Sequence, residues 1–128
     1  MMINDPAVLA EVTAVFERYE AALVDNDVAV LDELFLDSPL TVRYGIAENL
    51  HGSEAIRAFR LLRRSTGADR RLAETVITTY GRDTAIAATL FSHDSVPGRV
   101  GRQMQTWIRM PDGWRVAAAH VSVIDAQV

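Results

Sequence analysis

The chain has 128 residues, of which 49% are hydrophobic and 23% charged, and its net charge is −4 at pH 7. This balance predicts a single folded globular domain over residues 1–128, and the negative charge argues against nucleic acid as a partner. The absence of cysteine excludes disulfides, thiolate nucleophiles and cysteine-ligated zinc. All 13 positive residues are arginine, so Schiff-base catalysis by lysine is excluded as well.

The first residues, MMINDPAVLAEV, have no basic start and no long apolar run. No apolar stretch in the chain approaches the roughly 20 residues that cross a bilayer. We therefore expect no signal peptide, no membrane anchor and a cytoplasmic location.

The first predicted helix begins at Asp5 and Pro6, a typical N-cap followed by proline at the first helical position. Its apolar side chains recur at steps of three and four residues. These residues are Val8, Val12, Val15, Phe16, Tyr19 and Leu23. Asn26 and Asp27 are expected to end the helix.

Two shorter helices are predicted next. The apolar side of the second consists of Val30, Leu31, Leu34 and Phe35, and Ser38–Pro39 ends it. The third follows Ser53, which is expected to cap it. Its inward side chains are predicted to be Ile56, Phe59 and Leu62.

The remaining segments predict strands. TVRYG and ENLHG read as a hairpin before the third helix, and four runs rich in β-branched and aromatic residues follow it. The runs are Arg71–Tyr80, Thr84–Ser92, Arg99–Met110 and Trp114–Ile124. The predicted fold is therefore α+β: a cone-shaped half-barrel with three N-terminal helices packed on a curved, mostly antiparallel sheet.

The turn Met-Pro-Asp-Gly-Trp aligns the last two strands. A three-residue loop would place Met110 opposite Trp114, and the same count pairs Thr106 with Ala118, Met104 with His120, and Arg102 with Ser122. We expect the face with His120, Ser122 and Arg102 to line a polar pocket, with these residues near the substrate. The opposite face is expected to form a homodimer interface. Its members are Gln103, Gln105, Trp107, Arg109, Arg115, Ala117, Ala119 and Val121.

Three residues are candidates for catalysis. Arg43 interrupts a strand and could bind a substrate carboxylate if it points inward, or could simply be exposed. Tyr19 is either a core tyrosine or a proton donor in the pocket, and His120 is either a satisfied core histidine or an acid–base group. Asn49 is a weaker binding candidate across the hairpin from Arg43.

Other polar residues are given simpler interpretations. His51 and His93 are expected to be solvated, and three scattered histidines without ligand spacing predict no metal site. The arginines between Arg57 and Arg71 are interpreted as a solvated helix face paired with local acids.

Several segments resemble the AtzH-like family, which includes the HpxZ-type proteins of oxalurate catabolism. They are AEVTAVFERYEAALVDNDVAVLDELF, the pair TVRYG and ENLHG, and the carboxyl-terminal GRQMQTWIR and GWRVAAAHVS. The resemblance covers nearly the whole chain but is weaker over residues 91–100. It places the chain in the nuclear-transport-factor-like (SnoaL-like) superfamily.

The resemblance implies a cofactor-independent homodimer without metal. It also implies a decarboxylating amidohydrolase acting on a small anionic ureide such as 1,3-dicarboxyurea, with Tyr19 and Arg43 at the family's key positions and His120 in its AHVS end. A functional link to an amidase-signature enzyme is implied too, so the chain could instead be a non-catalytic binding or accessory protein. Because the predicted inward face has no aspartate, ketosteroid-isomerase-like and epoxide-hydrolase-like chemistry are disfavoured.

Overall fold

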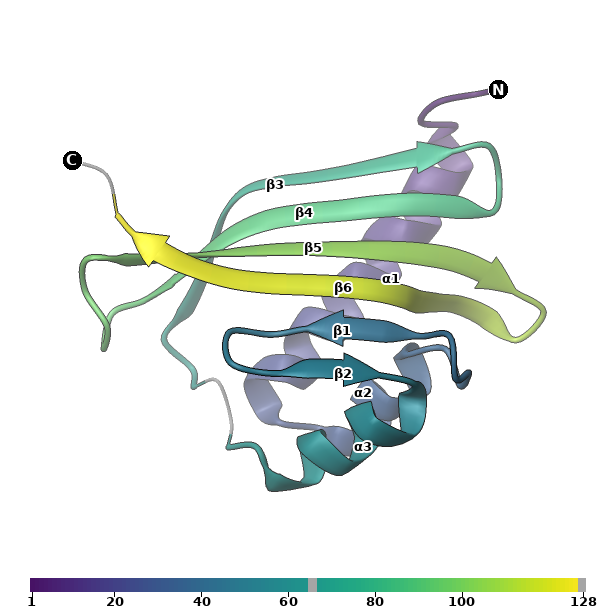
Figure 1. Cartoon of the computed structure of the whole chain (residues 1–128). Coiled ribbons are helices and arrows are strands. Elements are labelled where there is room, and N and C mark those ends of the chain that lie inside the picture. The colour runs from purple at the N-terminus through teal and green to yellow at the C-terminus, as the bar shows by residue number, and fades with distance from the viewer. Residues whose placement is uncertain (65–66, 127–128) are drawn as a thin grey trace.

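The computed structural model describes residues 1–64 and 67–126. Over these residues three helices come first in the chain and the long strands last (Figure 1). The helices are α1 (Pro6–Asp25), α2 (Val28–Leu34) and α3 (Ser53–Leu62). The strands are β1 (Val42–Tyr44), β2 (Asn49–His51), β3 (Arg70–Tyr80), β4 (Thr84–His93), β5 (Arg99–Met110) and β6 (Gly113–Asp125).

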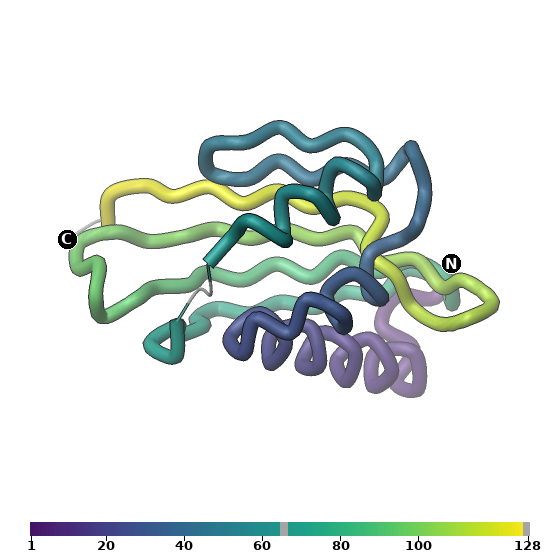
Figure 2. Tube along the Cα trace, turned by 90° about the horizontal axis from the view of Figure 1, so that it is seen from below, coloured from purple at the N-terminus to yellow at the C-terminus, as the bar shows by residue number. Residues whose placement is uncertain are grey.

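The strands form one sheet in the order β2-β1-β6-β5-β4-β3. All neighbouring strands are antiparallel except β1 and β6, which are parallel. All three helices lie on one side of this sheet, α1 along it and α3 beside the β1–β2 hairpin (Figure 2). The predicted α+β architecture is thus confirmed. Within the described ranges, no helix is long and apolar enough to cross a membrane.

The limits of α1 are those that local chemistry predicts. The Asp5 carboxylate accepts hydrogen bonds from the backbone N–H groups of Ala7 and Val8, 3.0 and 3.3 Å away. The helix ends at Asn26, which takes the left-handed conformation with φ of 53°. The predicted apolar stripe, Tyr19 included, is buried apart from the half-buried Val15.

The predictions for α3 were partly wrong. Ser53 does not cap the helix, because its hydroxyl instead donates to Asp37 and accepts from the backbone N–H of Ser38. Leu62 is 87% exposed rather than inward. The inward positions next to Ile56 belong to Arg60, which is 3% exposed, and to Phe59.

The register predicted for β5 and β6 is confirmed at its far end but not at the turn. Met104 pairs with His120 and Arg102 pairs with Ser122, as predicted. At the turn, however, Met110 pairs with Gly113 rather than with Trp114. The turn is one residue shorter than predicted. A bulge leaves Ala117 unpaired, and the predicted pairing holds again from Ala118 onward.

The same bulge makes the predicted choice of faces wrong. It reverses the side-chain alternation in β6, so that Val116 lies on the same face as Trp107 rather than on that of His120. This face packs against the helices, and Trp107 is fully buried among them. The predicted dimer face is therefore the inner face of the sheet.

Candidate functional site

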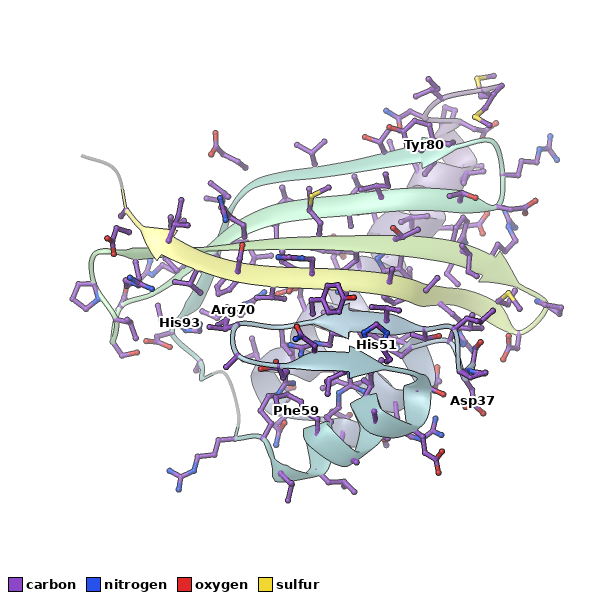
Figure 3. All side chains as sticks on the ribbon, in the orientation of Figure 1. Asp37, His51, Phe59, Arg70, Tyr80 and His93 are labelled. Carbon is purple, nitrogen blue, oxygen red and sulfur yellow. The ribbon has the colours of Figure 1, made fainter. Side chains whose placement is uncertain are left out.

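A cavity of about 280 Å³ lies between the inner face of the sheet, α1 and α3. Every strand except β2 and every helix except α2 contributes to its wall, together with the β1–β2 turn. The residues that line it are Tyr19, Leu23, Arg43, Ile46, Glu48, Phe59, Arg63, Arg70, Phe91, His93, Gln103 and Val121. Figure 3 shows Arg70 and His93 near one another at one end of the sheet, and Phe59 of α3 below the β1–β2 hairpin.

Arg43 points into this cavity from β1. Strand alternation turns Tyr44 to the outside and Arg43 to the inside, where its side chain is 9% exposed. Its Nη1 donates to Glu48 Oε1 across 2.7 Å, and its guanidinium lies over the Phe59 ring at 5.6 Å from the centroid. A Cβ on Gly45 would overlap the Glu48 carboxylate, so glycine at the turn leaves room for this ion pair.

Tyr19 reaches the cavity from the buried stripe of α1. Its ring packs against Phe35 and Trp107, each with 6.2 Å between ring centroids, which fixes its orientation. The residue is 4% exposed and lines the cavity. In the described part of the chain its hydroxyl forms no hydrogen bond, so the group is available to a ligand.

Arg70, Glu20 and Gln103 form a buried network on the cavity wall. Arg70 Nε donates to Glu20 Oε1 at 2.9 Å, and Gln103 bridges the two with bonds of 3.1 and 3.0 Å. The Arg70 guanidinium also stacks on Phe91 at 4.2 Å, and the lack of a side chain at Gly101 makes room for that ring. Because each charge is paired, the network is a stable polar wall.

Arg63 follows the last residue of α3 and also lines the cavity. Burial lowers the pKa of its guanidinium from the ordinary value, and the positive charges of Arg43 and Arg60 act in the same direction. Attraction to Tyr19 and Glu48 opposes this shift. Three arginines, Arg43, Arg63 and Arg70, therefore line the cavity.

His93 and Asp69 form a pair at the edge of the cavity, with 3.0 Å between His93 Nδ1 and Asp69 Oδ1. Hydrogen bonds to the Asp69 carboxylate hold the pKa of this carboxyl well below its usual range. Ser95 contributes most to this shift, and His93 contributes less. The side chain of His93 is only 20% exposed, so the prediction that it is solvated was wrong.

The structure brings Tyr19 and Arg43 together and leaves the other predicted site residues outside. His120 and Arg102 are exposed on the outer face, and Ser122, which accepts a hydrogen bond from Arg102, is beside them. Asn49 is exposed on the edge strand and pairs with Tyr44 rather than lying opposite Arg43. The predicted pocket positions of these four residues were wrong. The helices pack on the other face of the sheet, the face that carries Trp107, so these side chains lie outside the cavity.

The residues that were not predicted from the sequence are mostly charged side chains. They are buried and form ion pairs with residues that are distant in the sequence. Arg70 meets Glu20 across 50 positions of sequence, and Arg60 meets Asp32 across 28. No local pattern indicates such pairs. Glu48 could have been found, because it follows Arg43 across a tight hairpin turn.

Within residues 1–64 and 67–126, no three His, Asp or Glu side chains gather closely enough to bind one ion. The hydrogen-bond donors in the cavity wall include arginine, tyrosine and amide groups, and such donors suit an anionic organic ligand.

Comparisons with known proteins agree with this architecture. The chain is 60% identical to a DUF3225-family protein of unknown function from Pectobacterium atrosepticum, covering 96% of this chain and 95% of that one, with a TM-score of 0.92. It is 50% identical to a cystatin-like fold protein from Burkholderia xenovorans, covering 99% of each chain, with a TM-score of 0.96. No curated protein matches it.

A more distant structure shows the fold alone. An NTF2-like protein of unknown function from Pseudomonas putida is 19% identical to this chain, with a TM-score of 0.76. The match covers 91% of this chain and 86% of that protein. The AtzH-like family model matches residues 1–127, almost the whole chain. The chain therefore belongs to the AtzH-like family and has the NTF2-like α+β fold.

Proposed function

We propose that this protein is a cofactor-independent enzyme that removes a carboxylate from nitrogen in a small carboxylated ureide such as 1,3-dicarboxyurea, giving allophanate. The observation that carries the proposal is that Tyr19 and Arg43 line the same small cavity. The cavity lies near the lower end of the size range of ligand pockets, which suits a small substrate. Membership of the AtzH-like family supports the same substrate class.

The residues present can serve this reaction in a simple way. Arg43 would bind a carboxylate of the substrate through its guanidinium and hold the molecule in the cavity. The C–N bond to one carboxylate then breaks, the carboxylate leaves as carbon dioxide, and the bonding electron pair stays on nitrogen. A proton from the Tyr19 hydroxyl completes the new N–H bond.

The tyrosine must afterwards regain its proton. The phenolate left by the transfer would lie in the positive field of Arg43 and Arg63, which stabilises negative charge on the tyrosine oxygen. Water then returns the proton. No step requires a serine or cysteine nucleophile.

The direct test is to incubate the purified protein with 1,3-dicarboxyurea and to measure carbon dioxide and allophanate against the uncatalysed background. We expect the two products in equal amounts, and we expect Arg43→Gln to raise KM strongly while Arg82→Gln, an exposed change in the β3–β4 turn, has no effect. Binding without product would favour the alternative of a ligand-binding or accessory protein that works with an amidase. A background rate with no binding would contradict both functions.

A further inference from the structure

Arg63 differs from the other arginines around the cavity in having no carboxylate partner among the described residues. Arg43 pairs with Glu48 at 2.7 Å, Arg70 with Glu20 at 2.9 Å, and Arg60, in the turn of α3 before it, with Asp32 at 2.7 Å. Within the described ranges of the chain, Arg63 forms no ion pair, although it is half-buried on the cavity wall.

The buried part of the Arg63 side chain is also unsatisfied. Its Nε is shielded from solvent and has no hydrogen-bond acceptor among residues 1–64 and 67–126. A shielded guanidinium nitrogen without an acceptor costs free energy, because folding removes the water that would otherwise solvate it. Arg43, Arg60 and Arg70 are each paired with a carboxylate, whereas no carboxylate in the described part of the chain pairs with Arg63.

The surroundings of Arg63 point to an anionic ligand as the missing partner. Arg63 lines the same cavity as Arg43 and Tyr19, and it interacts electrostatically with each of them. The two Nη groups of a guanidinium form a fork that fits the two oxygens of a carboxylate. A carboxylate bound there would give the Arg63 charge a partner and offset the repulsion between Arg63 and Arg43.

We infer that Arg63 is a second carboxylate anchor and that the cavity selects dicarboxylates, with one carboxylate on Arg43 and the other on Arg63. This inference rests on the proposed function, because it assigns the two ends of the same substrate. The middle of the ligand would then lie beside the Tyr19 hydroxyl, where the proton is delivered. A monocarboxylate would satisfy only one of the two arginines and would bind more weakly.

Two matched, unreactive ligands test this assignment. Glutarate has two carboxylates joined by a three-atom chain, as in 1,3-dicarboxyurea, and butyrate is the same molecule with one carboxylate removed. Titration calorimetry should show tighter binding of glutarate than of butyrate by the unmodified protein. Arg63→Gln should weaken glutarate binding about tenfold or more and leave butyrate binding nearly unchanged.

The matched control is Arg64→Gln, which changes the exposed neighbouring arginine and should affect neither ligand. Thermal unfolding without ligand separates a binding role from a structural one. Because Arg63 has no carboxylate partner among the residues that the structure describes, Arg63→Gln should keep or raise Tm, whereas loss of a structural arginine would lower it.

Three results would overturn the inference: equal binding of glutarate and butyrate by the unmodified protein, an equal loss of both ligands in Arg63→Gln, or a lowered Tm in that variant. None of these measurements depends on turnover. A failure of the proposed reaction would therefore leave the dicarboxylate site standing, and a failure of the site would leave the reaction to be judged by its products.

Discussion

Arg43 and Glu48 face each other across the β1–β2 turn, with 2.7 Å between Arg43 Nη1 and Glu48 Oε1. Their side chains are 9% and 19% exposed, and both line the cavity that also contains Tyr19. The proposed carboxylate anchor is thus already in contact with a carboxylate of the protein. A ligand must share Arg43 with Glu48 or displace it.

Glu48 is therefore expected to weaken anion binding while it stabilises the fold. Glu48→Gln removes a negative charge from the cavity, so butyrate and glutarate should both bind several-fold more tightly. The same change leaves the buried Arg43 without its partner and should lower the free energy of unfolding by about 2 kcal/mol. Calorimetry and urea denaturation measure the two effects.

Glu54→Gln, an exposed change in the first turn of α3, is the control and should alter neither quantity. A fall in anion affinity in Glu48→Gln would mean that Glu48 contributes to the ligand site rather than competing with it.

The network of Glu20 with Arg70 is expected to matter mainly for stability. The two side chains are 12% and 3% exposed, and Gln103 bonds to both. Glu20→Gln leaves the Arg70 charge buried without a counter-charge and should cost about 3 kcal/mol of unfolding free energy. Glu17→Gln, an exposed change one turn earlier in α1, should be close to neutral. Equal stability of the two variants would contradict this view of the cavity wall.

Asp69 gives a prediction about pH. Hydrogen bonds from Ser95 and His93 hold the pKa of its carboxyl below the ordinary value in the folded protein. A depressed folded-state pKa stabilises the fold above the unfolded-state pKa of about 4, and this contribution disappears as pH falls toward the folded-state pKa. Asp69→Asn should therefore be less stable than the unmodified protein at pH 7, with the difference shrinking below about pH 4.

The measurement is the free energy of unfolding of both proteins across this pH range. Asp94→Asn, which removes an exposed carboxylate paired with Arg71, serves as the control and should show a much smaller difference. A difference for Asp69→Asn that stays constant with pH would contradict the assignment.

The predicted homodimer requires a different face from the one expected from sequence. A strip of side chains crosses the outer face of the sheet through paired positions, from Val76 through Ala88 and Met104 to His120 and Tyr44. Val76 and Met104 are 58% and 54% exposed. If the protein dimerises through this strip, Met104→Glu should shift its mass in solution toward the monomer.

Light scattering coupled to size-exclusion chromatography measures this shift. Leu62→Glu is the control, because Leu62 is 87% exposed on α3, away from the strip. A monomeric unmodified protein, or a dimer disrupted by Leu62→Glu alone, would contradict a dimer through the outer face.

The predictable features of this fold are those that depend on local chemistry. The cap at Asp5, the end of α1 at Asn26 and the inward stripe that includes Tyr19 follow from side-chain spacing and capping preferences. The inward position of Arg43 follows from alternation within a short strand, once the outer side is assigned to Tyr44.

The unpredictable features depend on packing between distant segments. The bulge at Ala117 reverses the faces of β6, and nothing in the run of small residues around it marks the unpaired position. Gln103 suggested a dimer interface, yet its side chain lies inside the protein, 3% exposed, because Glu20 and Arg70 satisfy its amide. His120 was consequently placed inside, although its pairing with Met104 was predicted correctly.

We propose that catalysis takes place at the Tyr19 hydroxyl within the arginine-lined cavity. The most direct measurement is the initial rate of carbon dioxide release from 1,3-dicarboxyurea by the unmodified protein, Tyr19→Phe and Tyr44→Phe. Tyr19→Phe removes one buried oxygen and should lower kcat about a hundredfold or more, as expected for loss of a proton donor. Tyr44→Phe removes the matching oxygen on the outer face and should retain full activity; a Tyr19→Phe variant as active as the unmodified protein would contradict the claim.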